Sequence, residues 1–213
     1  MNAHAACQPG ETLRPAAPAQ QSAPAAEPSL AATARLAARL AGVLTVAVST
    51  IGIAVHLGCA GWVRQQLAFH FPGVPARAAV AATVFVHNGH ALVAIGGALL
   101  VAQSPYLMTP AAQGGRVHRA VHQAMRVVCE AALAAAIGAN VIVIGASFGA
   151  YGMRMVRAAL PHGPVELVAY SLALALYLQG RRRPLPTRHA STVAALSISA
   201  LAAAALLETF VSV

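Results

Sequence analysis

The stretch VVCEAALAAAIGANVIVIGASFGAYGM, residues 127–153, decides the fold of this chain. Its one charged side chain is Glu130, and the rest is dominated by Ala, Val, Ile and Gly. A helix needs about 20 predominantly apolar residues to cross the hydrocarbon core of a bilayer. The stretch therefore predicts a membrane-spanning helix, long enough to be tilted or broken.

Four more apolar runs of similar length lie on either side of this stretch. Together they give five predicted spans, at about residues 40–63, 78–102, 127–153, 161–178 and 190–213. The 213-residue chain is 58% hydrophobic and only 9% charged. This composition excludes an ordinary soluble fold. We expect an all-α fold, a polytopic transmembrane helix bundle of about five spanning helices.

The first thirty residues have a different composition, rich in Ala, Gln and Pro. Their prolines are Pro9, Pro15, Pro18, Pro24 and Pro28. Such a segment cannot bury enough apolar surface to fold, and it has no apolar run typical of a cleaved signal peptide. We therefore predict a disordered Pro/Ala-rich cytoplasmic tail at residues 1–30, followed by a transmembrane helical domain at residues 31–213.

The net charge of +9 comes from arginine alone, because the chain has neither lysine nor aspartate. The arginines lie at the ends of the apolar runs rather than along one helix face, which favours anionic lipid headgroups over nucleic acid as their partners. Arginine-rich loops usually face the cytoplasm. Counting alternate loops predicts a multi-pass protein of the cell membrane, with the N-terminus cytoplasmic and the C-terminus outside.

Small residues recur through the third span, among them Gly138, Gly145, Gly149 and Gly152. Small residues let helix backbones approach closely in a membrane, so we expect this span to be central in the bundle. The alternative is that the pattern reflects only a chain rich in Gly and Ala.

The cysteines and histidines give no metal motif. Cys7, Cys59 and Cys129 form no C-x-x-C pair, and we expect all three to be unpaired. His87 and His90 share a helix face, but two histidines are one ligand short of a catalytic metal site. We predict no metal site and no cofactor.

The run Leu160-Pro161-His162-Gly163-Pro164-Val165-Glu166-Leu167 places two ionisable groups at the mouth of the fourth span. Ionisable side chains in a membrane are costly and usually functional. With the predicted topology, His56 and Glu208 fall on the same outer side, so two histidines and two carboxylates from three helices are expected to converge. His162, Glu166 and Glu208 are the catalytic candidates. The candidate binding or structural polar residues are His56, His87, Asn88, His90, Asn140 and Gly163.

Each polar residue also has a structural explanation. Glu166 could pair with Arg154, Arg157 or His162 and hold the hairpin between the third and fourth spans, and Glu208 could extend to water from the end of the last span. Asn88 and Asn140 could form hydrogen bonds between helices. Glu130 is expected to pair with Arg126, four residues before it.

The run from Leu160 to Ala169 resembles the P-H-G-x-x-E-L-x-A signature of the stage II sporulation protein M family, integral membrane proteins of bacteria and archaea. Looser similarities are Phe85-Val86-His87-Asn88, Asn140 to Gly145 and Leu207-Glu208-Thr209-Phe210, in the family's order. The chain departs from the family by having His87 in place of the first residue of an Asn-Asn pair and Val141 in place of a Gly.

The resemblance implies a membrane protein that organises peptidoglycan-degrading partners or accompanies a transport system. It raises His162, Gly163, Glu166, Asn88, Asn140 and Glu208 as site residues. We therefore expect a membrane subunit or scaffold, leaning towards a non-enzyme, whose partners are membrane lipids and membrane or envelope proteins in a homo- or hetero-oligomer. The alternative is a membrane-embedded enzyme that uses histidine and glutamate for acid-base chemistry on a peptide or lipid.

Overall fold

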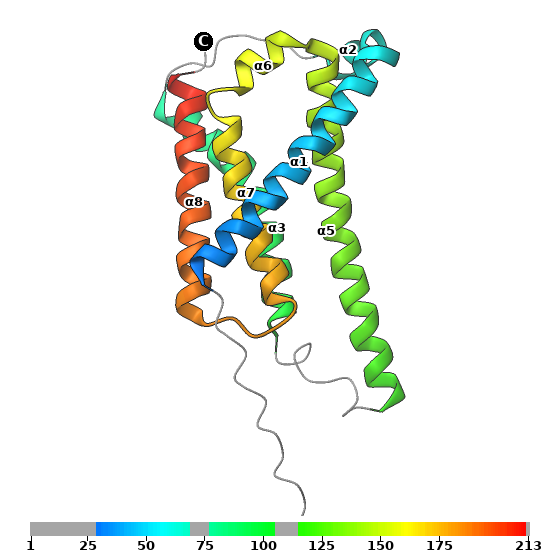
Figure 1. The fold of residues 1–213 in the computed structure, drawn as a ribbon, viewed down its shortest axis with the longest axis vertical. Coiled ribbons are helices and arrows are strands. Elements are labelled where there is room, and N and C mark those ends of the chain that lie inside the picture. Colours follow the sequence, from blue (N-terminus) through cyan, green and yellow to red (C-terminus); the bar gives the residue numbers. More distant parts are fainter. Residues whose placement is uncertain (1–28, 69–76, 105–114, 212–213) are drawn as a thin grey trace, which may run out of the picture.

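The computed structural model describes residues 29–68, 77–104 and 115–211, and its regular elements are all α-helices (Figure 1), which confirms the all-α prediction. The seven described helices are α1 (Leu30–Gly58), α2 (Ala60–Leu67), α3 (Ala78–Ala102), α5 (Arg116–Tyr151), α6 (Met153–Ala159), α7 (Gly163–Gly180) and α8 (Thr187–Phe210). Residues 1–28, most of the predicted tail, lie outside the described residues.

Four helices, α1, α3, α5 and α8, are long and apolar enough to cross a membrane. The pair α6 and α7 adds a fifth crossing if it is counted as one span, which is bent by 68°. The chain is therefore a multi-pass membrane protein, with four to five spans among the residues that the structure describes. In Figure 1 the chain passes up α1, down α3, up α5, down α7 and up α8, so α1 begins and α8 ends at opposite ends of the bundle.

Local chemistry explains where several helices begin and end. α1 begins at Leu30 because the Ser29 hydroxyl caps it, accepting a hydrogen bond from the Ala32 backbone N–H at 3.1 Å. Its 29 residues extend the first span well before residue 40. α5 has 36 residues and is about 54 Å long, more than a bilayer core requires, and it ends where Gly152 adopts a φ of 56°.

The small residues of α5 pack against α1. A Cβ added to Gly145 would lie 2.9 Å from the backbone oxygen of Val48 and 2.8 Å from the Cβ of Ile51. A Cβ on Gly149 would meet the backbone oxygen of Gly52 on α1, and Gly52 is itself buried against α5. These glycines are therefore needed for a close helix crossing, as the pattern predicted.

The expectation that this span is central was wrong. α5 lies at one edge of the bundle (Figure 1), and α7 is the central helix, packed against α1, α3 and α8. Of the α7 residues, Ala169 and Ala175 are fully buried, and Leu174 and Tyr177 join Ile95 and Leu133 in the hydrophobic core. Close packing at one crossing identifies a neighbour but does not determine how many other helices surround the span.

Candidate functional site

Five residues gather where α3, α7 and α8 meet, and we call them the polar cluster: Asn88, His162, Glu166, Tyr170 and Glu208. The bend between α6 and α7 positions two of them. His162 is the N-cap residue of α7, and its backbone oxygen accepts a hydrogen bond from the Glu166 backbone N–H at 3.0 Å. Pro164 is tolerated in this first turn, where a backbone N–H has no partner within the helix.

Asn88 connects α3 to α7 through two hydrogen bonds. Its side-chain amide donates to Glu166 Oε1, and its backbone oxygen accepts from the Tyr170 hydroxyl at 3.2 Å. Glu166 and Tyr170 are four residues apart, so they lie on one face of α7 and hold the same residue of α3. The α3–α7 contact is therefore fixed by a specific polar pairing as well as by apolar packing.

His162 connects α7 to α8. Its Nε2 lies 4.0 Å from Glu208 Oε2, and the two side chains are 15% and 27% exposed. The other ring nitrogen of His162, Nδ1, is buried and has no hydrogen-bond partner within the described residues. The last span therefore contributes a carboxylate to the polar cluster, and one ring nitrogen of His162 lies buried without a hydrogen-bond partner among the described residues.

The structure brings together three of the four ionisable residues expected in one layer. His56 is separate from them: it is exposed on α1, and its Nδ1 lies 3.3 Å from the backbone oxygen of Gly149 on α5. Within the polar cluster the side-chain partners also differ from those expected. Glu166 pairs with Asn88, while His162 faces Glu208.

The remaining candidates lie outside the polar cluster. Asn140 is exposed on α5 and donates to Ala136 O of its own helix at 2.9 Å, so its predicted role between helices is wrong. Gly163 begins α7, where a Cβ would make only an ordinary contact. His87 and His90 are exposed on α3, their ring centroids 6.5 Å apart.

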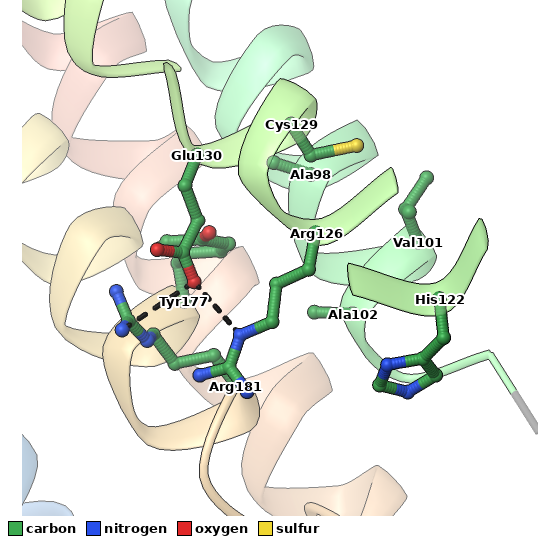
Figure 2. A pocket seen from close by; sticks show the side chains of 9 residues that line it. All are labelled: Ala98, Val101, Ala102, His122, Arg126, Cys129, Glu130, Tyr177 and Arg181. Atoms are coloured by element: carbon green, nitrogen blue, oxygen red, sulfur yellow. Dashed lines mark hydrogen bonds and ion pairs between the residues drawn. The ribbon is translucent and has the colours of Figure 1, made fainter. Parts of the chain in front are cut away.

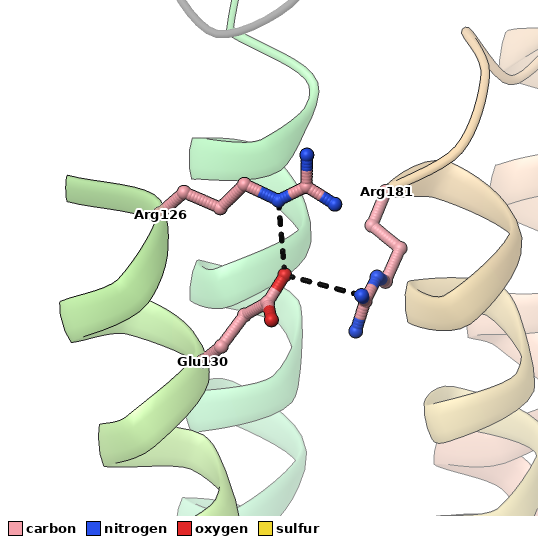
Figure 3. A network of polar contacts seen from close by, with 3 residues as sticks. All are labelled: Arg126, Glu130 and Arg181. Atoms are coloured by element: carbon pink, nitrogen blue, oxygen red, sulfur yellow. Dashed lines mark hydrogen bonds and ion pairs between the residues drawn. The ribbon is translucent and has the colours of Figure 1, made fainter. Parts of the chain in front are cut away.

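A second charged group lies near the opposite end of α7. Glu130 Oε1 accepts from Arg126 Nε at 3.1 Å, as predicted, and also lies 3.4 Å from Arg181 Nη2 (Figure 3). The sequence indicated the first contact because the residues are four apart on one helix. It gave no signal for the second, which joins α5 to the end of α7.

Two polar links near this end were missed by the sequence analysis. Thr33, on α1 and 1% exposed, donates to Gln179 Oε1 at 3.1 Å and lies 3.1 Å from His189 Nε2. Gln103 donates to the backbone oxygens of Gly180 and Arg183 and accepts from the Leu185 N–H. These side chains connect α1, α3, α7 and α8. No local sequence pattern predicts such contacts between helices.

The arrangement supports polar recognition and proton exchange within a helix bundle. Among the described residues, no group of three His, Cys, Asp or Glu side chains is placed to hold a metal ion, and Cys59 and Cys129 are free thiols. No family model, curated protein or solved structure matches this chain. The fold and the site define a class: a multi-pass α-helical membrane protein with partly buried ionisable groups between its helices.

Proposed function

We propose that this chain is a non-enzymatic membrane subunit or scaffold of a larger assembly, and that a partner helix binds α3 over His87 and His90. The observation that carries the proposal is the exposure of these two imidazoles. His90 lies at the midpoint of α3, a helix apolar enough to span the bilayer. Ionisable side chains within spans almost always face protein or a water-filled cavity, not lipid.

The surroundings of the two histidines fit a helix-binding face. Val86, Val93 and Leu100 are 60%, 73% and 74% exposed on the same helix, and a Cβ added to Gly97 would meet no atom of the described residues within 4 Å. Small residues next to larger apolar ones allow a second helix to approach closely. Among the four ring nitrogens of His87 and His90, the described residues give one a polar contact: His90 Nδ1 lies 3.0 Å from His87 O. The two rings therefore keep hydrogen-bonding capacity for a partner.

The polar cluster has a supporting role in this proposal. Asn88 directly follows His87, and its hydrogen bonds to α7 fix the rotation of α3 about its own axis. That rotation determines which α3 side chains face outward. Most of the polar groups in the cluster already contact one another. This supports a structural role in holding α3 against α7 over a catalytic role, which would need polar groups free to contact a substrate.

The proposal extends to the kind of assembly and its orientation. The sequence resemblance to the stage II sporulation protein M family supports a peptidoglycan-remodelling or transport-associated complex. The arginines at the start of α5 and around the α7–α8 connection outnumber those at the opposite end, which supports a cytoplasmic N-terminus and a C-terminus outside.

One observation favours the alternative, a membrane-embedded enzyme. The unpartnered Nδ1 of His162, with Glu208 beside Nε2, is a pairing that acid-base catalysis can use. An enzyme would need the charge of Glu166 or Glu208. A subunit would need only the helix packing that these groups support. A variant in which an apolar contact replaces the polar pair therefore distinguishes the two functions.

The test of the proposed function is a double substitution on α3, His87→Leu with His90→Leu. We expect the variant to insert and fold normally, because both side chains are exposed, and to lose the higher-mass species that wild-type protein forms on native gels of mildly solubilised membranes. The matched control is Thr45→Leu with Thr50→Leu, two exposed polar residues on α1. Loss of the complex in the control alone, or its survival in both variants, would show that α3 does not bind the partner.

A further inference from the structure

We propose that the groove between α1, α5 and α7 is a binding site for an anionic phospholipid, with an acyl chain in the groove and the phosphate at Arg126 and Arg181. The groove has a volume of about 580 Å³, within the usual range of small-molecule sites. Its walls are almost entirely apolar, including Leu40, Val43, Ala134, Ile137, Leu174 and Leu178. This site is separate from the α3 face and does not depend on the proposed function.

The charged end of the groove determines where the phosphate of the lipid would lie. Glu130 and Arg181 line the groove, and Arg126 joins them in a smaller adjoining cavity of about 40 Å³ (Figure 2). Both arginines contact the same carboxylate oxygen of Glu130, so the three side chains together carry a formal charge of +1. The side chains of Arg126 and Arg181 are 54% and 31% exposed, which leaves their guanidinium groups accessible to a phosphate.

The position of the charged end agrees with a lipid headgroup. Arg181 follows the last residue of α7 and begins a run of three arginines, while Arg126 lies at the start of the apolar part of α5. Both therefore lie at a membrane boundary, where the apolar groove runs from them into the bilayer. Basic pockets between membrane helices bind anionic lipid headgroups in other proteins.

The chemistry of the site favours a lipid over a second protein chain. A groove open to the hydrocarbon is filled by what surrounds it, and lipid tails are always present. A spanning helix would match the two arginines only if it carried an acidic residue at that boundary, whereas every anionic phospholipid joins an apolar tail to an anionic headgroup. Charge complementarity therefore selects an anionic phospholipid among the available occupants.

The test measures lipid retention by native mass spectrometry of the full-length protein, offered phosphatidylglycerol and phosphatidylcholine with identical acyl chains. We expect phosphatidylglycerol to be retained about fivefold more, the effect of one additional basic contact at a membrane surface. Arg126→Gln with Arg181→Gln should abolish this preference. Glu130→Gln should increase it, because the carboxylate no longer competes for the arginines. The control, Arg188→Gln, removes an exposed arginine near the same boundary and should change nothing.

The groove itself is tested by Ala134→Trp, which fills the apolar channel and should reduce retention of both lipids. Soluble glycerol phosphate should not compete, since the acyl chain supplies the apolar contact. The proposal is overturned if Arg188→Gln lowers the preference as much as the double substitution, or if Glu130→Gln lowers it. It is also overturned if Ala134→Trp leaves lipid retention unchanged and instead dissociates a dimer.

Discussion

Gly145→Ala is expected to destabilise the bundle by about 1–3 kcal/mol, the usual cost of forcing an extra group into a packed interior. The added Cβ would lie 2.9 Å from Val48 O, which belongs to backbone and cannot rotate away. α1 and α5 must then move apart, and the contacts around Gly52 and Gly149 loosen with them. The loss is measured as a lower midpoint of thermal unfolding in mild detergent.

The control for this prediction is Gly138→Ala, two turns earlier on the same helix. In the part of the chain that the structure describes, a Cβ at Gly138 has no heavy atom within 4 Å beyond its own helix, so this variant should unfold at or above the wild-type temperature. Equal midpoints for the two variants would contradict the close α1–α5 crossing.

Asn88→Leu is expected to be the second strongly destabilising change, because it leaves the partly buried Glu166 carboxyl without its amide donor. Removing one partner of a buried hydrogen bond costs about 1–3 kcal/mol, whereas replacing both partners with apolar groups is often nearly neutral. We therefore expect Asn88→Leu with Glu166→Leu to recover most of the lost stability. Asn140→Leu, at an asparagine that is exposed and bonded within its own helix, should have little effect.

This double variant also separates the two candidate functions. If the polar cluster serves as a lock between α3 and α7, Asn88→Leu with Glu166→Leu should retain the native-gel complex as well as the stability. An enzyme that depends on the Glu166 carboxylate would be stable and inactive. A double variant no more stable than Asn88→Leu alone would refute the pairing itself.

The sequence predicts the spans well because their signals are local. The third run is apolar over a membrane length, and the predicted second span, residues 78–102, coincides with α3. The pair Arg126 and Glu130 was likewise predictable, since residues four apart on a helix are neighbours. Each of these signals lies within one helix and needs no knowledge of tertiary contacts.

Contacts between helices could be predicted only in part. His162, Glu166 and Glu208 were expected together because topology places them near one boundary, but their partners depend on helix rotation, which the sequence does not define. Asn88 was considered for a hydrogen bond between helices, but its partner, Glu166, depends on the packing of α3 against α7, which no local pattern defines. The contact between Arg181 and Glu130 likewise depends on how the helices pack, because the two residues are 51 positions apart in the sequence.

The assignment of α5 to the centre of the bundle failed for a physical reason. The glycines of α5 indicate that one neighbouring helix packs closely against it, and that helix is α1. The centrality of α7 arises from burial along the helix, where Ala169, Ser171 and Ala175 are buried, and from its packing against α1, α3 and α8. In a membrane, lipid-facing and protein-facing positions are both apolar, so hydrophobicity alone does not distinguish an edge helix from a central one.

Photocrosslinking in native membranes, with a light-activated amino acid at Val93, would show directly whether α3 binds a partner helix. Val93 lies one turn from His90 on the exposed face of α3. The matched position is Val46, which is 66% exposed on α1. We expect a discrete protein adduct at Val93 and only lipid adducts at Val46. Lipid adducts alone at Val93, with the protein at its native abundance, would contradict the claim that α3 binds a partner in the membrane.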